Sequence, residues 1–212
     1  MRLLIFGATG KTGKEIVKQG IANGYDVTAF VRNANSLDET YGKLNVIEGD
    51  ALDYSAVNGA VQNHDAVVCA LGMPSLMDRS QLRTKATKNI VAAMTAWNIN
   101  RLICLSAFGA GDSFSHMPKH YRYLISPLLM RNLYRDHNGQ EKIVRESKLV
   151  WTIVRPAILV DGAITGHYWH GVDPANKSLK NRIARADVAE FMLDQISEKN
   201  YIYQTPLISY RN

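Results

Sequence analysis

The sequence predicts an α/β fold, a doubly wound parallel sheet with helices on both of its faces. Short, continuously apolar runs recur along the chain, and they lack the alternation that is typical of strands with one face in water. Segments with a helical spacing of apolar residues separate these runs, and such regular alternation of strand and helix is the second observation. The third is length, because 212 residues suit one domain. We therefore expect residues 1–212 to form a single domain.

Seven strands are predicted in chain order. The most apolar runs lie at 3–6, 66–71, 102–106 and 151–154, and we expect them to form the centre of the sheet. Runs that fit further strands lie at 26–31, 44–47 and 206–210.

Helices are expected between the strands. One apolar stripe follows the first strand at positions 16, 17, 20 and 21, and another runs from Leu82 to Trp97 in steps of three and four. A third runs from Val188 to Ile196. Within the long connection at 107–148, Ser126-Pro127 predicts a helix start, with serine at the cap and proline in the first turn.

Two long loops are expected around a substrate pocket, at about 107–136 and 156–185. Gly139 is expected to interrupt the helical pattern before residues 140–147. The second loop is rich in Gly, Asp, Asn and Pro, which indicates irregular structure over the edge of the sheet.

Composition excludes several classes of protein. No apolar run approaches the roughly 20 residues that cross a bilayer, and the N-terminal segment lacks the pattern of a signal peptide. We therefore expect a cytoplasmic protein without membrane contact, in which Leu128-Leu129-Met130 belongs to the core or to a lid face. Cys69 and Cys104 lie in apolar runs and should be buried, reduced thiols.

The basic excess suits nucleic acid or, equally, a small polyanionic ligand, and the histidine spacing indicates no metal. The net charge is +6, and residues 177–185 form a local basic segment without an acid. Because no basic stripe with interleaved aromatic residues accompanies it, nucleic-acid binding is a minor alternative. The histidine pairs do not suit a metal site, and we expect no metal. The oligomeric state expected is a monomer or a weak homodimer.

The motif GATGKTG at residues 7–13 carries the functional argument. It follows a predicted buried strand and opens a predicted helix, which is the context that a dinucleotide-binding turn requires. Gly7 would allow the tight turn, Gly10 the close approach of a pyrophosphate, and Gly13 the packing of helix on strand. A nucleotide-triphosphate loop is excluded, because Ile5 stands where that motif needs a glycine.

The end of the second strand favours NADP(H) over NAD(H). An acidic residue there would bind the ribose 2′-hydroxyl, but the chain has Arg32, whose guanidinium can pair with a 2′-phosphate. Lys11 in the glycine turn adds positive charge nearby.

The motifs together resemble those of the atypical short-chain dehydrogenases with an NAD(P)H-binding Rossmann fold. The resemblance rests on GATGKTG, GDALD at 49–53, TKNIVAAM at 87–94, CLSAF at 104–108 and VRESKLVWTIVRPA at 144–157, and it extends to about residue 198. Within that family the chain is most similar to the flavin and biliverdin-IXβ reductases, and more distantly to NmrA-like proteins.

The resemblance implies a set of site residues. The pyrophosphate would be held by Gly7, Thr9, Gly10, Lys11 and Thr12, with Arg32 on the 2′-phosphate and Asp50 and Ala51 beside the adenine. Leu71 and Gly72 would lie under the ribose and nicotinamide, and the nicotinamide pocket would be lined by Ser106, Ala107, Phe108, Pro156 and Ala157. His137 and Ser106 are the candidate catalytic residues. The chain departs from the reductases at Ile158, where they have a histidine, and between Phe108 and His137.

The absence of one catalytic pair of residues limits the classes of reaction that this protein could catalyse. Short-chain dehydrogenases that act on alcohols use Tyr-x-x-x-Lys, and no tyrosine of this chain has a lysine four residues later. We therefore expect NADPH-dependent hydride transfer to a planar acceptor such as a flavin, a quinone or a tetrapyrrole like biliverdin. His137, with a pKa near the ordinary ~6.5, would help to place a proton.

Two alternatives stay open beside the reductase. The first is an NmrA-like redox sensor that binds NADP(H) without turnover, with the basic segments as its docking surface. The second is a scaffold that keeps the fold and binds no dinucleotide, which the intact GATGKTG disfavours.

Overall fold

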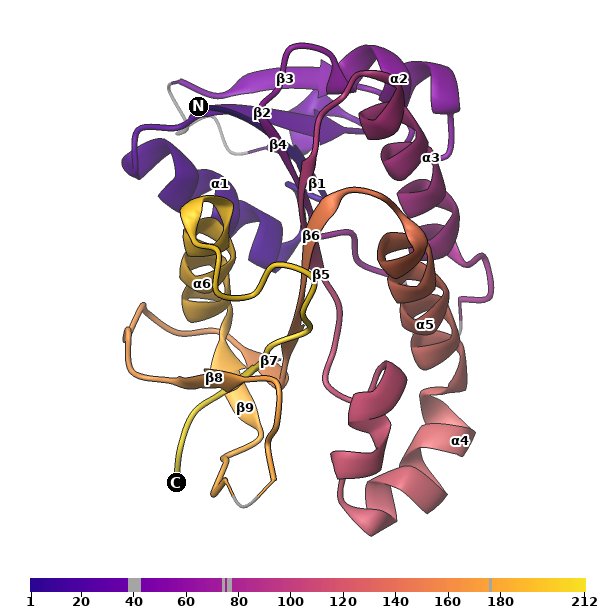
Figure 1. The fold of residues 1–212 in the computed structure, drawn as a ribbon, viewed down its shortest axis with the longest axis vertical. Helices are drawn as coiled ribbons and strands as arrows, with labels where there is room; N and C mark the ends of the chain where they lie inside the picture. Colours follow the sequence, from indigo (N-terminus) through magenta and orange to yellow (C-terminus); the bar gives the residue numbers. More distant parts are fainter. Residues whose placement is uncertain (38–42, 74, 76–77, 176) are drawn as a thin grey trace.

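An eight-stranded sheet forms the centre of the molecule, in the order β3-β2-β1-β4-β5-β6-β10-β8 (Figure 1). The computed structural model describes residues 1–212 except 38–42, 74, 76–77 and 176. Its strands are β1 (Arg2–Phe6), β2 (Asp26–Val31), β3 (Asn45–Glu48), β4 (Ala66–Cys69), β5 (Arg101–Leu105), β6 (Val150–Pro156), β8 (Trp169–Gly171) and β10 (Leu207–Ser209). All neighbours pair in parallel except β10 and β8. The doubly wound α/β prediction is confirmed.

Helices cover both faces of this sheet (Figure 1). One face carries α1 (Lys11–Ala22) and α6 (Arg185–Ser197), and the other carries α2 (Tyr54–Val61), α3 (Leu82–Ala96) and α5 (Arg131–Glu146). Side chains of β1 alternate between the two layers, since Leu3 and Ile5 pack in the α1/α6 core whereas Leu4 and Phe6 pack in the α2/α3/α5 core. Burial on both faces explains why these strands are continuously apolar.

The strand order reverses between β1 and β4. The chain leaves β1 toward β2 and β3 on one side and returns to β4 on the other, so the carboxyl ends of β1 and β4 flank a crevice. Ligands of open α/β sheets bind at such a point. Cys69 and Cys104 face each other in the β4–β5 register, fully buried and reduced as predicted.

An α-helix, α4 (Ser126–Leu129), begins at the predicted Ser126-Pro127, but the prediction that Ser126 caps it is wrong. Ser126 has helical angles (φ −62°, ψ −50°), and it continues a π-helical turn at Tyr121–Ile125 into α4 (Ser126–Leu129). Proline lacks the N–H of a regular helical bond, and here the turn before it widens instead of ending. A 3-10 turn at Gly111–His116 precedes this segment, and another at Ala34–Ser36 follows β2.

Gly139 does not interrupt a helix, contrary to expectation. It lies in the middle of α5, where a Cβ would come within 2.4 Å of the Thr84 hydroxyl of α3. The glycine permits close packing of α3 on α5, at a cost in helix propensity of about 1 kcal/mol.

The region 156–185 is more regular than predicted. It holds β7 (Ile158–Val160) and β9 (Arg182–Ala184), which pair in parallel as a small second sheet, besides β8 on the edge of the main one. Such short strands carry little periodicity, so the sequence does not show them. Among the described residues, the structure has no helix with the length and hydropathy of a membrane span.

Candidate functional site

The glycine turn between β1 and α1 has the geometry that its sequence predicts. Gly7 has a φ of +86°, and a Cβ there would lie 2.4 Å from the carbonyl oxygen of Ala70. At Gly13 a Cβ would lie 2.0 Å from the Gly7 carbonyl oxygen. Gly10 differs, because its Cβ would meet only that same oxygen, at 3.3 Å. Gly7 and Gly13 are therefore required by the turn, whereas Gly10 leaves its outer side open to a ligand.

The start of α1 leaves backbone donors available. Gly10 is the N-cap, and no side chain of the described residues caps the helix. The first turn also holds no acidic residue. Uncapped N–H groups at a helix N-terminus bind phosphate, so the residues present here fit a pyrophosphate. Thr9 is exposed beside Gly10, and Thr12 is buried.

Two ion pairs that the sequence does not predict share one carboxylate, and one of them joins the glycine turn to the loop after β7. The Lys11 Nζ lies 3.0 Å from one Asp161 carboxylate oxygen, and the Arg185 guanidinium lies 2.6 Å from the other. Asp161 is exposed, so water screens these pairs and they add little stability. Both cations stay close to the crevice.

A cavity of about 740 Å³ extends from the glycine turn over the carboxyl ends of the strands. Residues that the sequence analysis assigned to the cofactor site or to catalysis line one side of it: Gly10, Lys11, Thr12, Leu71, Gly72, Ser106, Ala107, Phe108, His137, Pro156 and Ala157. The opposite side comes from the segment 117–134, including Met117, Tyr121, Met130, Leu133 and Tyr134. The expected loop at 107–136 is thus a largely helical cover over an apolar cavity.

A buried polar cluster, here called the polar floor, lies behind Ser106 and His137 of the cavity lining. The Ser106 hydroxyl donates a hydrogen bond to Glu141 Oε1 at 2.7 Å, and it lies 3.4 Å from His137 Nδ1. The Arg155 guanidinium binds both oxygens of Glu141, at 2.9 and 2.6 Å. Ser106, Glu141 and Arg155 are each at most 4% exposed. The forked pair balances two buried charges and fixes the serine hydroxyl.

Sequence reasoning missed Glu141 and Arg155. Glu141 lies four residues after His137 on α5, and Arg155 directly precedes Pro156 at the end of β6. Arg155 could have been noticed as a charged residue at the end of an apolar strand. Its partner Glu141 could not, because the sequence does not show which face of α5 points toward that strand end.

His137 is neutral in this site, and the expectation of an ordinary pKa is wrong. Burial, with the Arg83 guanidinium as a second cause, lowers the pKa of His137 to about 3. The side chain is 4% exposed, so desolvation of the imidazolium dominates. At neutral pH His137 can donate or accept a hydrogen bond but does not carry an acidic proton.

Arg83 is a further cavity residue that the sequence did not reveal. Its Nε donates to the Leu71 carbonyl oxygen at 2.9 Å, and one terminal nitrogen lies 3.6 Å from Asp136. That nitrogen has no hydrogen-bond partner among the described residues, although the side chain is 7% exposed. Asp136 is engaged elsewhere, because it accepts the backbone N–H groups of Arg83 and Thr84 at the start of α3. Arg83 therefore lines the cavity with a buried guanidinium that is ion-paired with Asp136, and one of its nitrogens lacks a hydrogen bond.

The residues expected at the adenine end lie along the same edge, outside the cavity. Arg32 follows β2 directly and is exposed, with no hydrogen bond or ion pair to any residue that the structure describes. Asp50 and Ala51 follow β3, where the Asp50 carboxylate accepts the Leu52 N–H at 2.9 Å and Ala51 is buried. Asn89 of α3 holds the Ala51 carbonyl at 3.0 Å.

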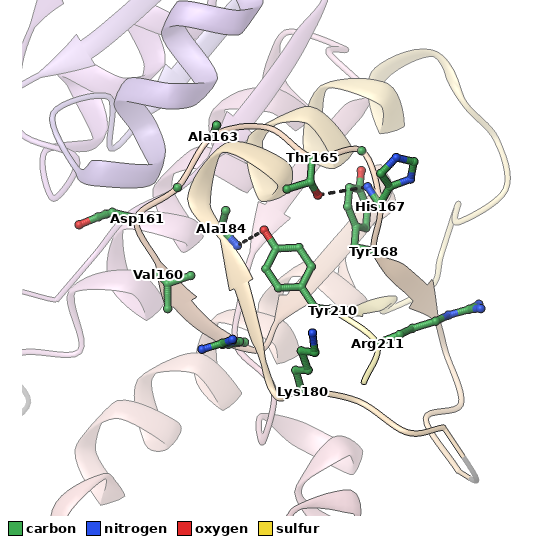
Figure 2. A pocket seen from close by; sticks show the side chains of 13 residues that line it. Val160, Asp161, Ala163, Thr165, His167, Tyr168, Lys180, Ala184, Tyr210 and Arg211 are labelled. Atoms are coloured by element: carbon green, nitrogen blue, oxygen red, sulfur yellow. Dashed lines mark hydrogen bonds between the residues drawn. The ribbon is translucent and has the colours of Figure 1, made fainter.

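A second cavity, of about 980 Å³, lies against the small sheet and the loop after β7 (Figure 2). Tyr210 stands within it, and its hydroxyl accepts the Ala184 N–H at 3.1 Å and donates to the buried Asp187 at 2.5 Å. Lys180, Arg182 and Arg211 line it, and all three are exposed. No residue expected to bind the dinucleotide lines it, so the smaller cavity is the candidate site.

Comparison with known families agrees with this geometry. The family model described as NAD(P)H-binding matches residues 7–199. The chain belongs to this NAD(P)H-binding family. Its domain is thus one that binds a nicotinamide dinucleotide, as the glycine turn predicts.

Similar proteins cover nearly the whole chain. The Bacillus subtilis protein YwnB is 28% identical over 209 residues, which are 95% of this chain and 94% of that protein. The structure of ChuY from Escherichia coli O157:H7 superposes with a TM-score of 0.82 at 23% identity, covering 99% and 97% of the two chains. A short-chain dehydrogenase/reductase from Veillonella parvula, solved with NADP, superposes with a TM-score of 0.79 at 19% identity over 98% and 94%.

Proposed function

We propose that this protein is an NADPH-dependent reductase that transfers hydride to a planar acceptor such as a flavin, a quinone or a tetrapyrrole. One observation carries the proposal. A single cavity joins the glycine turn at one end to an apolar, partly aromatic cover at the other, with buried Ser106 and neutral His137 between them. A cofactor and a flat apolar acceptor could share that space.

The cofactor would lie along the carboxyl edge of the sheet. The N–H groups at the start of α1 and the Lys11 ammonium would hold its pyrophosphate, and Arg32 its 2′-phosphate. NADPH supplies the hydride when bound. Leu71, Ala107 and Pro156 would position the nicotinamide against the cavity, whose lining is mainly apolar.

The polar floor of the cavity suits acceptors that need no strong acid. Glu141 accepts the hydrogen bond of the Ser106 hydroxyl, and His137 is neutral. Burial raises the pKa of Tyr134 to about 12. These groups can orient an acceptor by hydrogen bonds, and a proton would come from water. Conjugated acceptors spread the charge of the added hydride, which suits this arrangement better than a simple ketone does.

Similar proteins support this direction. ChuY is described as an anaerobillin reductase, and the Veillonella protein binds NADP. The NmrA-like sensor remains the second candidate, and the lack of an acidic proton donor favours it.

Turnover separates the two candidates. Purified protein would be mixed with NADPH and, in turn, FMN, FAD, a soluble quinone and biliverdin, and loss of NADPH absorbance would be followed. The reductase proposal expects slow but measurable oxidation with at least one acceptor. Tight NADPH binding without turnover of any acceptor would favour the sensor.

His137→Ala tests how far the buried histidine contributes. Because the neutral imidazole can only orient or relay, we expect the rate to fall by less than the ~10²–10⁴-fold of an essential general acid. The measurement is kcat for the best acceptor, with Ser106→Ala beside it. A larger loss in His137→Ala, with NADPH affinity unchanged, would make the histidine an obligatory proton donor.

A further inference from the structure

The cover of the cavity exposes large apolar side chains to solvent. Tyr123, Leu124, Leu128 and Leu129 are 68%, 61%, 78% and 67% exposed. All four lie between residues 123 and 129 of the helical stretch 121–129, here called the cover helix, which ends with α4 at the lower end of the molecule in Figure 1. Scattered exposed leucines are ordinary, but four large apolar residues within about two protruding helical turns are typical of an interaction surface.

The charged residues in the sequence of the cover have one sign only. Residues 117–135 contain Lys119, Arg122, Arg131 and Arg135 and no Asp or Glu. Lys119, Arg131 and Arg135 are exposed. The acid that follows, Asp136, is 1% exposed and is bound to the start of α3. The surface is therefore apolar and cationic, without a neutralising carboxylate of its own segment.

We propose that the cover helix docks on the surface of an anionic lipid bilayer. Leucine and tyrosine side chains would enter the region between headgroups and acyl chains, while the lysine and arginine side chains contact lipid phosphates. Arg122 suits this boundary, since its guanidinium stacks 5.4 Å from the Tyr123 ring centre and 5.8 Å from that of Phe114. Such a helix lies on a membrane and need not span it.

Charge also disfavours a second copy of this chain as the occupant. A two-fold contact would place the same patch on both subunits, so the cations Lys119, Arg131 and Arg135 of one subunit would face the same set of cations on the other. Juxtaposed like charges disfavour such a contact. An anionic surface has the complementary charge.

The position of the cover helix connects docking to the cavity. The residues that line the cavity precede and follow the exposed ones in the sequence. They are Pro118, His120 and Tyr121 before them, and Met130 and Leu133 after them. A docked molecule would therefore hold one wall of its cavity against the lipid. This step rests on the proposed function. Docking then makes an acceptor dissolved in the membrane, such as a long-chain quinone, the favoured substrate class. It revises the sequence-based expectation of no membrane contact.

Vesicle co-sedimentation tests the docking without any turnover. We expect the protein to sediment with vesicles of equal parts phosphatidylglycerol and phosphatidylcholine and to stay in solution with phosphatidylcholine alone. Leu128→Glu/Leu129→Glu should lower the bound fraction at least about tenfold, since it removes apolar area and adds repulsion. Lys119→Gln/Arg131→Gln should weaken binding as well, and about 0.5 M salt should mimic it.

A matched control separates this surface from general charge. Ile164→Glu/Val172→Glu introduces the same two charges at apolar residues that are 48% and 56% exposed elsewhere, and it should bind vesicles almost as well as wild type. Equal loss in both Glu variants, or no binding by wild type, would overturn the proposal. So would concentration-dependent dimerisation, in sedimentation velocity, that the Leu128/Leu129 variant abolishes. Turnover of soluble acceptors should be unchanged in that variant, so a failed reductase assay and failed docking are distinguishable.

Discussion

Arg32 is the residue whose role is most specific to the cofactor. It stands at the end of β2, exposed and without a partner in the described part of the chain. We expect Arg32→Ala to weaken NADPH binding about tenfold or more, the equivalent of about 1.5–3 kcal/mol for a charge-assisted pair. NADH, which lacks the 2′-phosphate, should bind almost unchanged. Fluorescence titration of both cofactors measures this, with Lys199→Ala as an exposed control, and equal weakening of both would contradict the assignment.

The buried histidine should make the protein sensitive to acid. His137 has a folded-state pKa of about 3, and the unfolded chain has the ordinary ~6.5. Between these values the unfolded state binds the extra proton, so the free energy of unfolding falls as the pH is lowered, by about 1.4 kcal/mol per unit at most. Urea unfolding at pH 7 and pH 5 should show the loss, and His137→Gln should reduce that difference. The same pH slope in the variant would place the sensitivity in other groups.

Single residues also show where the sequence is uninformative. The glycine turn and Arg32 could be placed because strand ends and helix starts fix their surroundings. Glu141, Arg155 and Arg83 could not, since each acts through a partner from a distant element. The pKa of His137 likewise depends on its burial in the folded protein and on the Arg83 guanidinium from α3, which no local pattern describes.

At the scale of elements, the two outer glycines of the turn should behave differently from the middle one. Gly13→Val would drive a side chain into the Gly7 carbonyl and should prevent normal folding, whereas Gly10→Val has room on its outer side. We expect Gly10→Val to melt near the wild-type temperature and to lose NADPH binding. Thermal melts beside titrations test this. A folded Gly10→Val that still binds NADPH would contradict the phosphate site at α1.

Strands and most helices could be predicted at this scale, and the cover could not. Continuous apolar runs identify β1, β4, β5 and β6 because both faces of each are buried. The segment between Phe108 and α5 is different, since a π-turn, exposed leucines and a proline obey no single period. Gly139 was misjudged for a related reason, because tertiary packing against Thr84 outweighs its low helix propensity.

At the scale of the whole molecule, we propose that one cavity receives both the nicotinamide and the acceptor. The sheet places the glycine turn, Ser106 and Pro156 on one edge, and the cover helix with the start of α5 closes the space above them. Neither part forms the site alone. Filling the cover side of the cavity should therefore block the acceptor and spare the cofactor.

Leu133→Trp tests this claim most directly. Leu133 lines the cavity on its cover side, whereas Leu128, five residues earlier in the sequence, is exposed and makes Leu128→Trp the matched control. The measurement is NADPH affinity beside NADPH oxidation with the best soluble acceptor. We predict that Leu133→Trp keeps the NADPH Kd within about twofold, a change of under 0.5 kcal/mol, and loses most acceptor turnover, while Leu128→Trp retains both. Undiminished turnover in Leu133→Trp would contradict the account.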